Sequence, residues 1–142
     1  MQNNQISLSL SNEFILNKDN VVFKDIIIDR KSHYTVVWKK LSTKEEIDKF
    51  IKDLILDDYY RKATHNSYAY RIKLENWSVL EWKNDDWEIW AGMCILRELQ
   101  RENAIDLLLI VTRYFWWIKL QSDRFKNVIN ACKMFFKKEK NL

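Results

Sequence analysis

Two short segments of the sequence carry the side chains that could take part in acid/base or metal chemistry. The first contains His65 and Asn66, and the second contains Asp85, Asp86 and Glu88. A histidine near several carboxylates could transfer protons or bind a metal ion if the fold brought these groups together. Their spacing is not diagnostic, because the sequence contains no H-E-x-x-H, C-x-x-C or G-x-S-x-G motif.

A structural role is the plainer interpretation of the same residues. Carboxylates at the start of a helix accept hydrogen bonds from its free amide groups and interact favourably with its dipole. Asp85, Asp86 and Glu88 are therefore interpreted first as a turn followed by a charged helix start. His65, beside Asn66, could simply cap the start of a strand.

Tyr68, Tyr70 and Arg71 belong to a segment that alternates in the manner of a strand. The two tyrosines share one strand face, and Arg71 points to the other with Ala69. Core packing is favoured for the tyrosines over the alternative, a surface on which nucleic-acid bases stack.

A third group of polar residues follows a long apolar run: Arg113, Tyr114, Lys119, Asp123 and Arg124. Arg113 enters a turn directly after this run, so it is the charge that we most readily interpret as functional or as part of a polar network. A weaker possibility is that Arg113 and Lys119 flank a surface that binds an anion.

The hydrophobic periodicity predicts an α/β fold of two layers, in the order β-β-β-α-β-β-α-β-α. A capping box at Ser42 to Glu45 starts the first helix, and the apolar run before Arg113 suits a central strand. The predicted strands are 13–16, 21–28, 33–37, 67–74, 79–82 and 105–114. The predicted helices are 43–56, 91–100 and a last one that begins at Ser122 or Asp123.

The 142 residues fit one domain, for which we expect residues 21–140 after an N-terminal extension of residues 1–20. The net charge of +4 is compatible with nucleic-acid neighbours without requiring them. The longest apolar run falls short of the about 18 residues that a membrane span needs, and the N-terminus lacks the features of a secretory signal. We expect a cytoplasmic protein without membrane contact, in which Cys94 and Cys132 are buried thiols rather than a disulfide or redox pair.

The sequence contains one glycine, no proline and seven tryptophans. Average usage would give roughly ten glycines and seven prolines in a chain of this length. Glycine is the usual residue wherever the backbone needs a positive φ. Asn76-Trp77 and Asp86-Trp87 nevertheless occupy places where Asn-Gly or Asp-Gly would make a type I′ turn.

Four segments together resemble the Impact/YigZ family, also known as the UPF0029 type. Residues 63–72 (ATHNSYAYRI) resemble the family's A-x-H-x-x-Y-A-Y-R segment, and residues 84–88 (NDDWE) resemble its S/D-D-D-G-E segment. Residues 113–120 (RYFWWIKL) are similar to R-Y-F/Y-G-G-I-x-L, and residues 122–126 (SDRFK) contain the D-R-F-K of Impact-like members. The four segments occur in the family's order over roughly residues 30 to 137, which makes the resemblance more specific than any single motif.

The resemblance implies a fold similar to the second domain of ribosomal protein S5, with a mostly antiparallel or mixed sheet and helices packed on one face. It also implies a role in the regulation of translation. Eukaryotic Impact-like members bind a large ribosome-associated activator and restrain the activation of an initiation-factor kinase, and a nucleic-acid or ribosome-related role is suspected for the bacterial members. Neither the N-terminal RWD domain of the eukaryotic members nor the C-terminal ferredoxin-like domain of the bacterial ones is expected here.

From this resemblance we predict a non-catalytic binding module with no cofactor and no metal. Its expected partner is the ribosome, RNA or a translation-associated protein. The positions that match the family motifs are the candidate binding residues: His65, Asn66, Tyr70, Arg71, Asp85, Asp86, Glu88, Arg113, Tyr114, Lys119, Asp123 and Arg124. The alternative is a small hydrolase-like or metal-dependent enzyme that uses Asp85, Asp86, Glu88 and His65.

The tryptophans depart from the family pattern in a systematic way. Trp87, Trp116 and Trp117 stand where the family has glycine, and Trp38, Trp77, Trp82 and Trp90 stand at turn-like or small-residue places. One cause would explain the missing glycine and the surplus tryptophan together: UGA codons that the source organism reads as glycine have been translated as tryptophan. The suspected glycine positions are Trp77, Trp82, Trp87, Trp90, Trp116 and Trp117.

Overall fold

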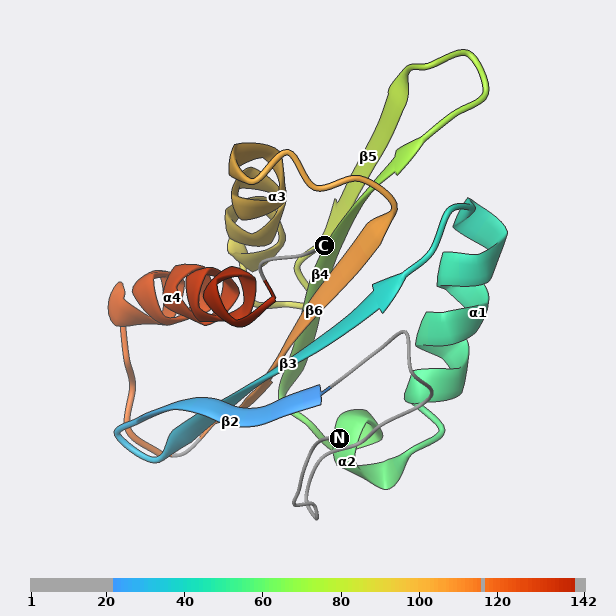
Figure 1. Cartoon of the computed structure of the whole chain (residues 1–142). Helices are drawn as coiled ribbons and strands as arrows, with labels where there is room; N and C mark the ends of the chain where they lie inside the picture. The colour runs from blue at the N-terminus through green and yellow to red at the C-terminus, as the bar shows by residue number, and fades with distance from the viewer. Residues whose placement is uncertain (1–21, 116, 140–142) are drawn as a thin grey trace.

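A five-stranded antiparallel sheet with helices on both faces forms the part of the chain that the computed structural model describes, residues 22–115 and 117–139 (Figure 1). The strands are β2 (Val22–Asp29), β3 (Ser32–Lys40), β4 (His65–Lys73), β5 (Val79–Asn84) and β6 (Leu107–Tyr114). The helices are α1 (Lys44–Leu54), α2 (Asp58–Arg61), α3 (Ala91–Arg101) and α4 (Asp123–Lys138).

The strand order is β2-β3-β6-β4-β5, so β6 lies in the centre of the sheet. Residues 107–113 of this strand are all buried, which confirms the central position predicted from its apolar sequence. The predicted hairpin of β4 and β5 is also confirmed, because these two strands pair in antiparallel register from Lys73 and Val79 onwards.

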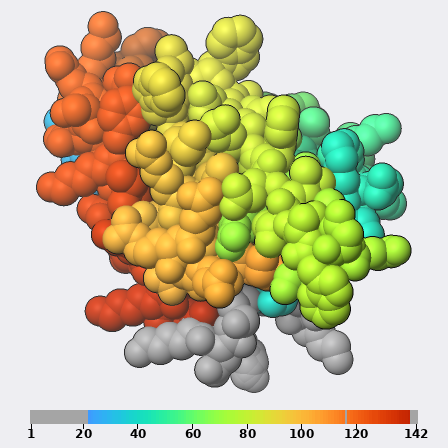
Figure 2. Space-filling view, turned by 90° about the horizontal axis from the view of Figure 1, so that it is seen from above, coloured from blue at the N-terminus to red at the C-terminus, as the bar shows by residue number. Residues whose placement is uncertain are grey.

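The two faces of β6 belong to two separate cores. Leu107, Leu109 and Val111 pack in the core that α3 and α4 cover. The intervening residues, Leu108 and Ile110, pack in the core that α1 and α2 cover. Figure 1 shows the two pairs of helices on opposite sides of the sheet, and Figure 2 shows α3 and α4 side by side on one face. The α/β prediction is confirmed, and the expectation of helices on one face holds for α3 and α4 only.

A capping box determines where α1 begins. Thr43 is the residue before the helix, its Oγ1 accepts a hydrogen bond from the Glu46 amide (3.1 Å), and Glu46 Oε1 accepts one from the Thr43 amide (3.1 Å). The capping box therefore begins one residue later than Ser42, where the sequence pattern placed it. The short helix α2 was not predicted, and Asp57 caps it by accepting from the Tyr59 amide (2.8 Å).

The remaining element predictions agree to within a few residues at each end, apart from one strand. The strand predicted at residues 13–16, like the N-terminal extension, lies outside the described residues. Cys132 is buried and Cys94 is half-buried, and both are free thiols, as predicted. None of the helices in the described ranges is both long and apolar enough to cross a bilayer.

Candidate functional site

The antiparallel pairing of β4 and β6 brings the first two sequence motifs together. β4 begins where β6 ends, so His65 stands directly opposite Arg113 in the register. On the other side of β6, Tyr34 of β3 stands opposite the same arginine. His65 and Arg113 lie on the strand face that α3 and α4 cover, while Asn66 lies on the face toward α2, where its side-chain amide donates to the Tyr60 carbonyl (2.8 Å).

The loop between β5 and α3, residues 85–90, is tied to the start of β4 by three hydrogen bonds. His65 Nδ1 donates to the Asp86 carbonyl oxygen (2.9 Å), and the Asn66 amide donates to Asp86 Oδ2 (2.7 Å). The Ser67 hydroxyl donates to the Asp85 carbonyl oxygen (2.7 Å). These contacts place Glu88 between the ends of β4 and β6.

Glu88 is the centre of a buried ionic cluster. Its side chain pairs with His65 through Oε2 (3.0 Å to Nε2) and with Arg113 through Oε1 (2.5 Å to Nη1). Glu88 and Arg113 are each 5% exposed, so both charges are removed from solvent. Such a pair is retained only when each charge has a close opposite partner. We call His65, Glu88 and Arg113 the ionic cluster.

The ionic cluster shifts two pKa values in opposite directions. Burial opposes the charged form of His65, but its hydrogen bonds to Glu88 and to the Asp86 carbonyl outweigh burial, so the pKa of His65 is raised. Burial also opposes the Glu88 carboxylate, but the hydrogen bond from His65 and the charge of Arg113 outweigh it, so the pKa of Glu88 is lowered. Both nitrogens of His65 face acceptors, which favours the doubly protonated ring.

Arg113 is held by aromatic rings as well as by Glu88. Its guanidinium carbon lies 5.7 Å from the centre of the Tyr34 ring and 5.4 Å from that of the Phe115 ring. Its Nε atom is buried and has no hydrogen-bond partner, which leaves one donor of the guanidinium unsatisfied. The arginine is therefore fixed in place at the base of the loop rather than extended toward solvent.

Asp85 caps α3, as its structural interpretation predicts. One of its oxygens accepts from the Gly92 amide (2.7 Å), and the other accepts from the Trp90 amide (3.2 Å). A Cβ atom at Gly92 would lie 3.0 Å from the backbone of Asn84, so the close approach of α3 to the end of β5 requires glycine there. Asp85 and Gly92 thus fix the start of α3 against the sheet.

The chain is similar to a known protein family over most of its length. The family described as the Impact N-terminal domain matches residues 30–135, which include the whole ionic cluster. The chain belongs to the Impact N-terminal domain family. Among the relatives are an IMPACT homologue of Dictyostelium discoideum, 32% identical over 107 residues, and the IMPACT protein of Oryctolagus cuniculus, 34% identical over 116 residues. These alignments cover 75% and 81% of this chain, which spans about a third of each relative's length (31% and 36%).

Two solved structures share the fold. The two-domain translational regulator Yih1 has a TM-score of 0.57 and 24% sequence identity, over 82% of this chain and 46% of that chain. The crystal structure of a hypothetical protein has a TM-score of 0.66 and 16% identity, over 82% of this chain and 61% of that chain. At these identities the likeness concerns the fold.

Several other candidate residues of this Impact N-terminal domain lie away from the ionic cluster. Tyr70 is buried in the core beneath α1. Arg71 lies toward the far end of β4, where it binds Glu81 (2.8 Å) and the Ala104 carbonyl (3.0 Å). Both residues contribute to the architecture of the sheet in this structure.

The candidates of the fourth motif lie near the turn between β2 and β3. Asp123 forms an ion pair with Arg30, and Arg124 donates to the Gln121 carbonyl (3.1 Å) while it covers the Phe125 ring. Lys119 is exposed in the segment before α4. The structure therefore brings together residues of segments 63–72, 84–88 and 113–120, whereas segment 122–126 forms the start of α4.

Tyr114 points to the opposite side of the sheet from Arg113, because neighbouring residues of a strand alternate. Its hydroxyl donates to the Tyr59 carbonyl, and the two rings lie 5.0 Å apart. Sequence reasoning missed Tyr59, which belongs to the unpredicted helix α2, and it missed Tyr34, which only the register of β3 places beside Arg113. Neither tyrosine belongs to a periodic pattern in the sequence, so no sequence signal pointed to either of them.

Three of the suspected glycine positions adopt a left-handed backbone. Asp86 and Trp87, with φ values of 47° and 69°, are the central residues of a turn closed by the Glu88 amide and the Asp85 carbonyl (3.0 Å). Trp90, with φ 76° and ψ −7°, is the third residue of the next turn, closed by the Ala91 amide and the Glu88 carbonyl (2.9 Å). Such turns require a positive φ at these places and ordinarily contain glycine.

Trp77 is the third of these positions. It has a φ of 69° and closes the β4–β5 hairpin by donating to the Leu74 carbonyl (3.0 Å). Asn76 does not have a positive φ, so the two-residue type I′ turn predicted at Asn76-Trp77 is wrong. The hairpin has a longer loop that ends on a left-handed residue, for which glycine is again the usual choice.

Trp38 and Trp82 do not occupy turns, which corrects their sequence-based placement. Trp38 lies within β3, is 7% exposed and packs 5.7 Å from the ring of Phe135. Trp82 lies in β5 opposite Tyr70. Trp117 is exposed beside Phe115, and Trp116 lies outside the described residues.

Proposed function

We propose that the chain is a non-catalytic binding module that acts in the regulation of translation, in the cytoplasm, through contact with the ribosome, RNA or a translation-associated protein. Membership of the Impact family supports this role, as does the shared fold with Yih1, which is a translational regulator. One structural observation carries the non-catalytic part of the proposal. Both oxygens of Glu88 are engaged by the side chains of His65 and Arg113 of the same chain, which supports a role for the ionic cluster in positioning the loop.

The binding surface would be the exposed side chains that the ionic cluster holds at one end of the sheet. Ile89 in the loop before α3 is 60% exposed, and Phe115, Ile118 and Lys119 are exposed in the segment after β6. The two segments meet at the start of β4, because Thr64 accepts from the Phe115 amide through its hydroxyl (2.9 Å) and donates its own amide to Arg113. We call Ile89, Phe115, Ile118 and Lys119 the loop surface.

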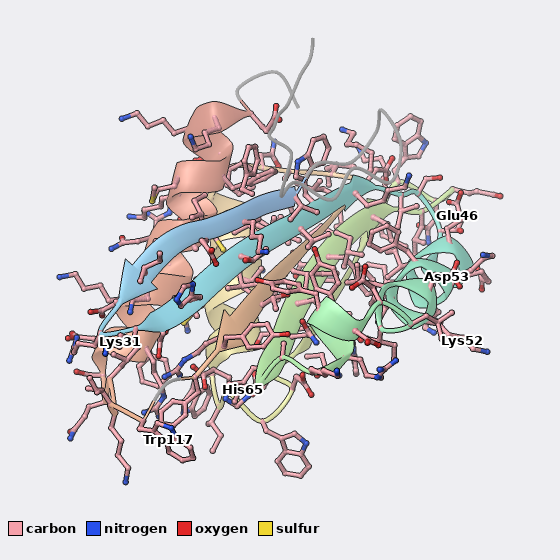
Figure 3. All side chains as sticks on the ribbon, turned by 90° about the horizontal axis from the view of Figure 1, so that it is seen from below. Lys31, Glu46, Lys52, Asp53, His65 and Trp117 are labelled. Atoms are coloured by element: carbon pink, nitrogen blue, oxygen red, sulfur yellow. The ribbon has the colours of Figure 1, made fainter. Side chains whose placement is uncertain are left out.

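Sedimentation with ribosomes tests this proposal. The full chain, added to an extract of its source organism in low salt, should move into the ribosomal fractions of a sucrose gradient. The double variant Ile89→Ser/Lys119→Ala should be depleted from those fractions, whereas Lys52→Ala should behave as the unmodified chain, because Lys52 lies on α1, away from His65 and Trp117 (Figure 3). Absence of the unmodified chain from the ribosomal fractions would contradict the proposal.

A second candidate function, a hydrolase-like enzyme, is favoured by one observation. His65 contacts Glu88 (3.0 Å), and a carboxylate in such contact can orient a histidine for proton transfer, but the second nitrogen of His65 contacts the Asp86 carbonyl (2.9 Å) and would have to leave it to reach a reactant. Phosphodiester and carboxylic-ester substrates, with and without divalent cations, would test it. Turnover that His65→Gln abolishes while the fold is retained would establish this function, and equal background rates would eliminate it.

We further propose that the native protein carries glycine at the suspected positions through UGA codons. The left-handed backbone at Trp77, Trp87 and Trp90 supports this, because a residue with a Cβ pays about 1–2 kcal/mol in that conformation. Trp38 is not among these positions, and its indole ring is packed in a core. The gene should contain UGA at 77, 87 and 90 and UGG at 38. UGG at the three turn positions would refute the proposal.

A further inference from the structure

A cavity lies on the face of the sheet opposite the ionic cluster, at the same end. Its volume is about 670 Å³, within the usual range for small-ligand sites. His33 and Tyr114 stand opposite each other in the pairing of β3 and β6 and contribute to its wall. The lining includes Lys24, Lys31, His33, Tyr59, Tyr114 and Phe115. None of the lining residues in the described part of the chain is a tryptophan, although the Phe115 ring packs beside that of Trp117 (6.4 Å between ring centres).

A bulge in β2 shapes one wall of this cavity. The register of β2 against β3 shifts between Phe23 and Ile27, and Asp25 within the bulge has a φ of 54°. The Asp25 amide donates to Thr35 Oγ1 (3.0 Å), and its carboxylate pairs with His33 Nδ1 (3.0 Å). Bulges of this kind redirect side chains and are common beside functional sites. The Asp25 carboxylate in the cavity wall is therefore in contact with His33.

Aromatic rings form another part of the wall, next to the bulge. The Tyr59 hydroxyl is held by Thr35 Oγ1 (2.8 Å), and the Lys24 ammonium lies 4.9 Å from the centre of the Tyr59 ring. Burial raises the pKa of Tyr59 to about 12, so its phenol stays neutral at physiological pH. Tyr114 and Phe115 are partly exposed at the mouth. The cavity therefore combines aromatic faces with the cationic groups of Lys24 and Lys31.

We propose that this cavity binds one nucleotide of a single-stranded RNA, with the base against the aromatic wall and the phosphate near Lys24 and Lys31. Aromatic rings accept any base by stacking, and lysines neutralise the backbone phosphate. Lys24 and Lys31 bring two ammonium groups to the cavity, whose lining also contains the Asp25 carboxylate in contact with His33 (3.0 Å). The inference deepens the proposed role in translation and rests on it for its biological setting, but its site is separate from the loop surface except for Phe115.

Fluorescence anisotropy with a labelled single-stranded uridine oligonucleotide tests the inference on the full chain. The unmodified chain should bind in low salt. Tyr114→Leu should weaken binding about tenfold, since it removes a stacking ring that belongs to the cavity but not to the loop surface and keeps an apolar side chain there. Lys24→Gln should reduce the slope of log affinity against log salt by about one phosphate contact. Phe125→Leu and Lys52→Gln are matched controls that lie outside the cavity lining and should bind as the unmodified chain.

The outcomes separate this inference from the proposed function. Weaker oligonucleotide binding by Tyr114→Leu, with the controls unchanged, supports the cavity. Equal binding by Tyr114→Leu and the unmodified chain overturns it, as does uridine monophosphate binding as tightly as the oligonucleotide, which would indicate a free-nucleotide site. If the unmodified chain sediments with ribosomes but does not bind the oligonucleotide, the cavity inference alone fails.

Discussion

Neutralising Glu88 should destabilise the fold far more than neutralising an exposed carboxylate. The variant Glu88→Gln keeps the size and shape of the side chain but removes the charge that Arg113 and His65 share. Arg113 would then remain as a buried cation whose other close neighbours are the rings of Tyr34 and Phe115. The cost should therefore come from an uncompensated buried charge rather than from lost packing.

The magnitude follows from the burial of both partners. Removing one partner of a buried ion pair costs about 3–5 kcal/mol, and a hydrogen bond to a charged group contributes about 1.5–3 kcal/mol. The glutamine side-chain oxygen can still accept from one of the two donors, so we expect the free energy of unfolding to fall by about 3 kcal/mol. The exposed pair of Lys49 and Asp53 gives the comparison, because Asp53→Asn should cost less than about 1 kcal/mol.

Equilibrium unfolding in urea, followed by circular dichroism, measures both variants. The difference between Glu88→Gln and Asp53→Asn should be about 2 kcal/mol or more, at an unchanged dependence on urea. A double variant Glu88→Gln/Arg113→Met should recover part of the loss, because it removes the stranded cation. If Glu88→Gln lowers the free energy of unfolding no more than Asp53→Asn does, the buried charges of the ionic cluster do not stabilise the loop.

Three further predictions follow from particular residues. The pKa of His65 is raised, so its contribution to stability is complete below its ordinary value of 6.5 and is lost as pH rises through the folded-state pKa. The pKa of Glu88 is lowered, so its contribution is present above 4.5 and is lost as pH falls through the folded-state pKa. Urea unfolding at several pH values should show a decline above pH 6.5 that His65→Gln lacks; an equal decline in the variant would assign it to other groups. Trp87→Gly should raise the free energy of unfolding by about 1 kcal/mol, and Trp38→Ala should lower it by about 3–5 kcal/mol. If both variants change the free energy of unfolding in the same direction, the distinction between a turn position and a core position is wrong. Thr43→Ala should lower it by about 1 kcal/mol through loss of the α1 cap, and an unchanged melting temperature would show that the cap contributes nothing.

Much of the fold could be predicted because the sequence patterns are local. The apolar run of β6, the amphipathic pattern of α1 and the start of α4 at Asp123 each follow from short-range periodicity. The positive φ at Trp87 was predictable from turn chemistry at Asp86-Trp87 alone. The convergence of His65 and Arg113 could not be predicted from the sequence, because their register depends on long-range strand pairing.

The parts that could not be predicted depend on tertiary contacts. Helix α2 is one turn long and has too few residues for a periodic pattern, so Tyr59 and the cavity beside it were missed. Trp38 was grouped with turn residues because composition does not distinguish a buried indole from a misread codon, whereas its packing on Phe135 does. Arg71 belongs to the same motif as His65 but lies toward the other end of β4, since five residues of strand separate them.

We propose that the turns around the ionic cluster are built for glycine, so that the loop between β5 and α3 of the native protein lacks the exposed indoles of positions 87 and 90. The intact mass of the protein isolated from its source organism tests this most directly. We expect a mass below the 17.4 kDa of the printed sequence, by the difference between an indolylmethyl group and a hydrogen atom at each position that carries glycine. A mass equal to that of the printed sequence would contradict it.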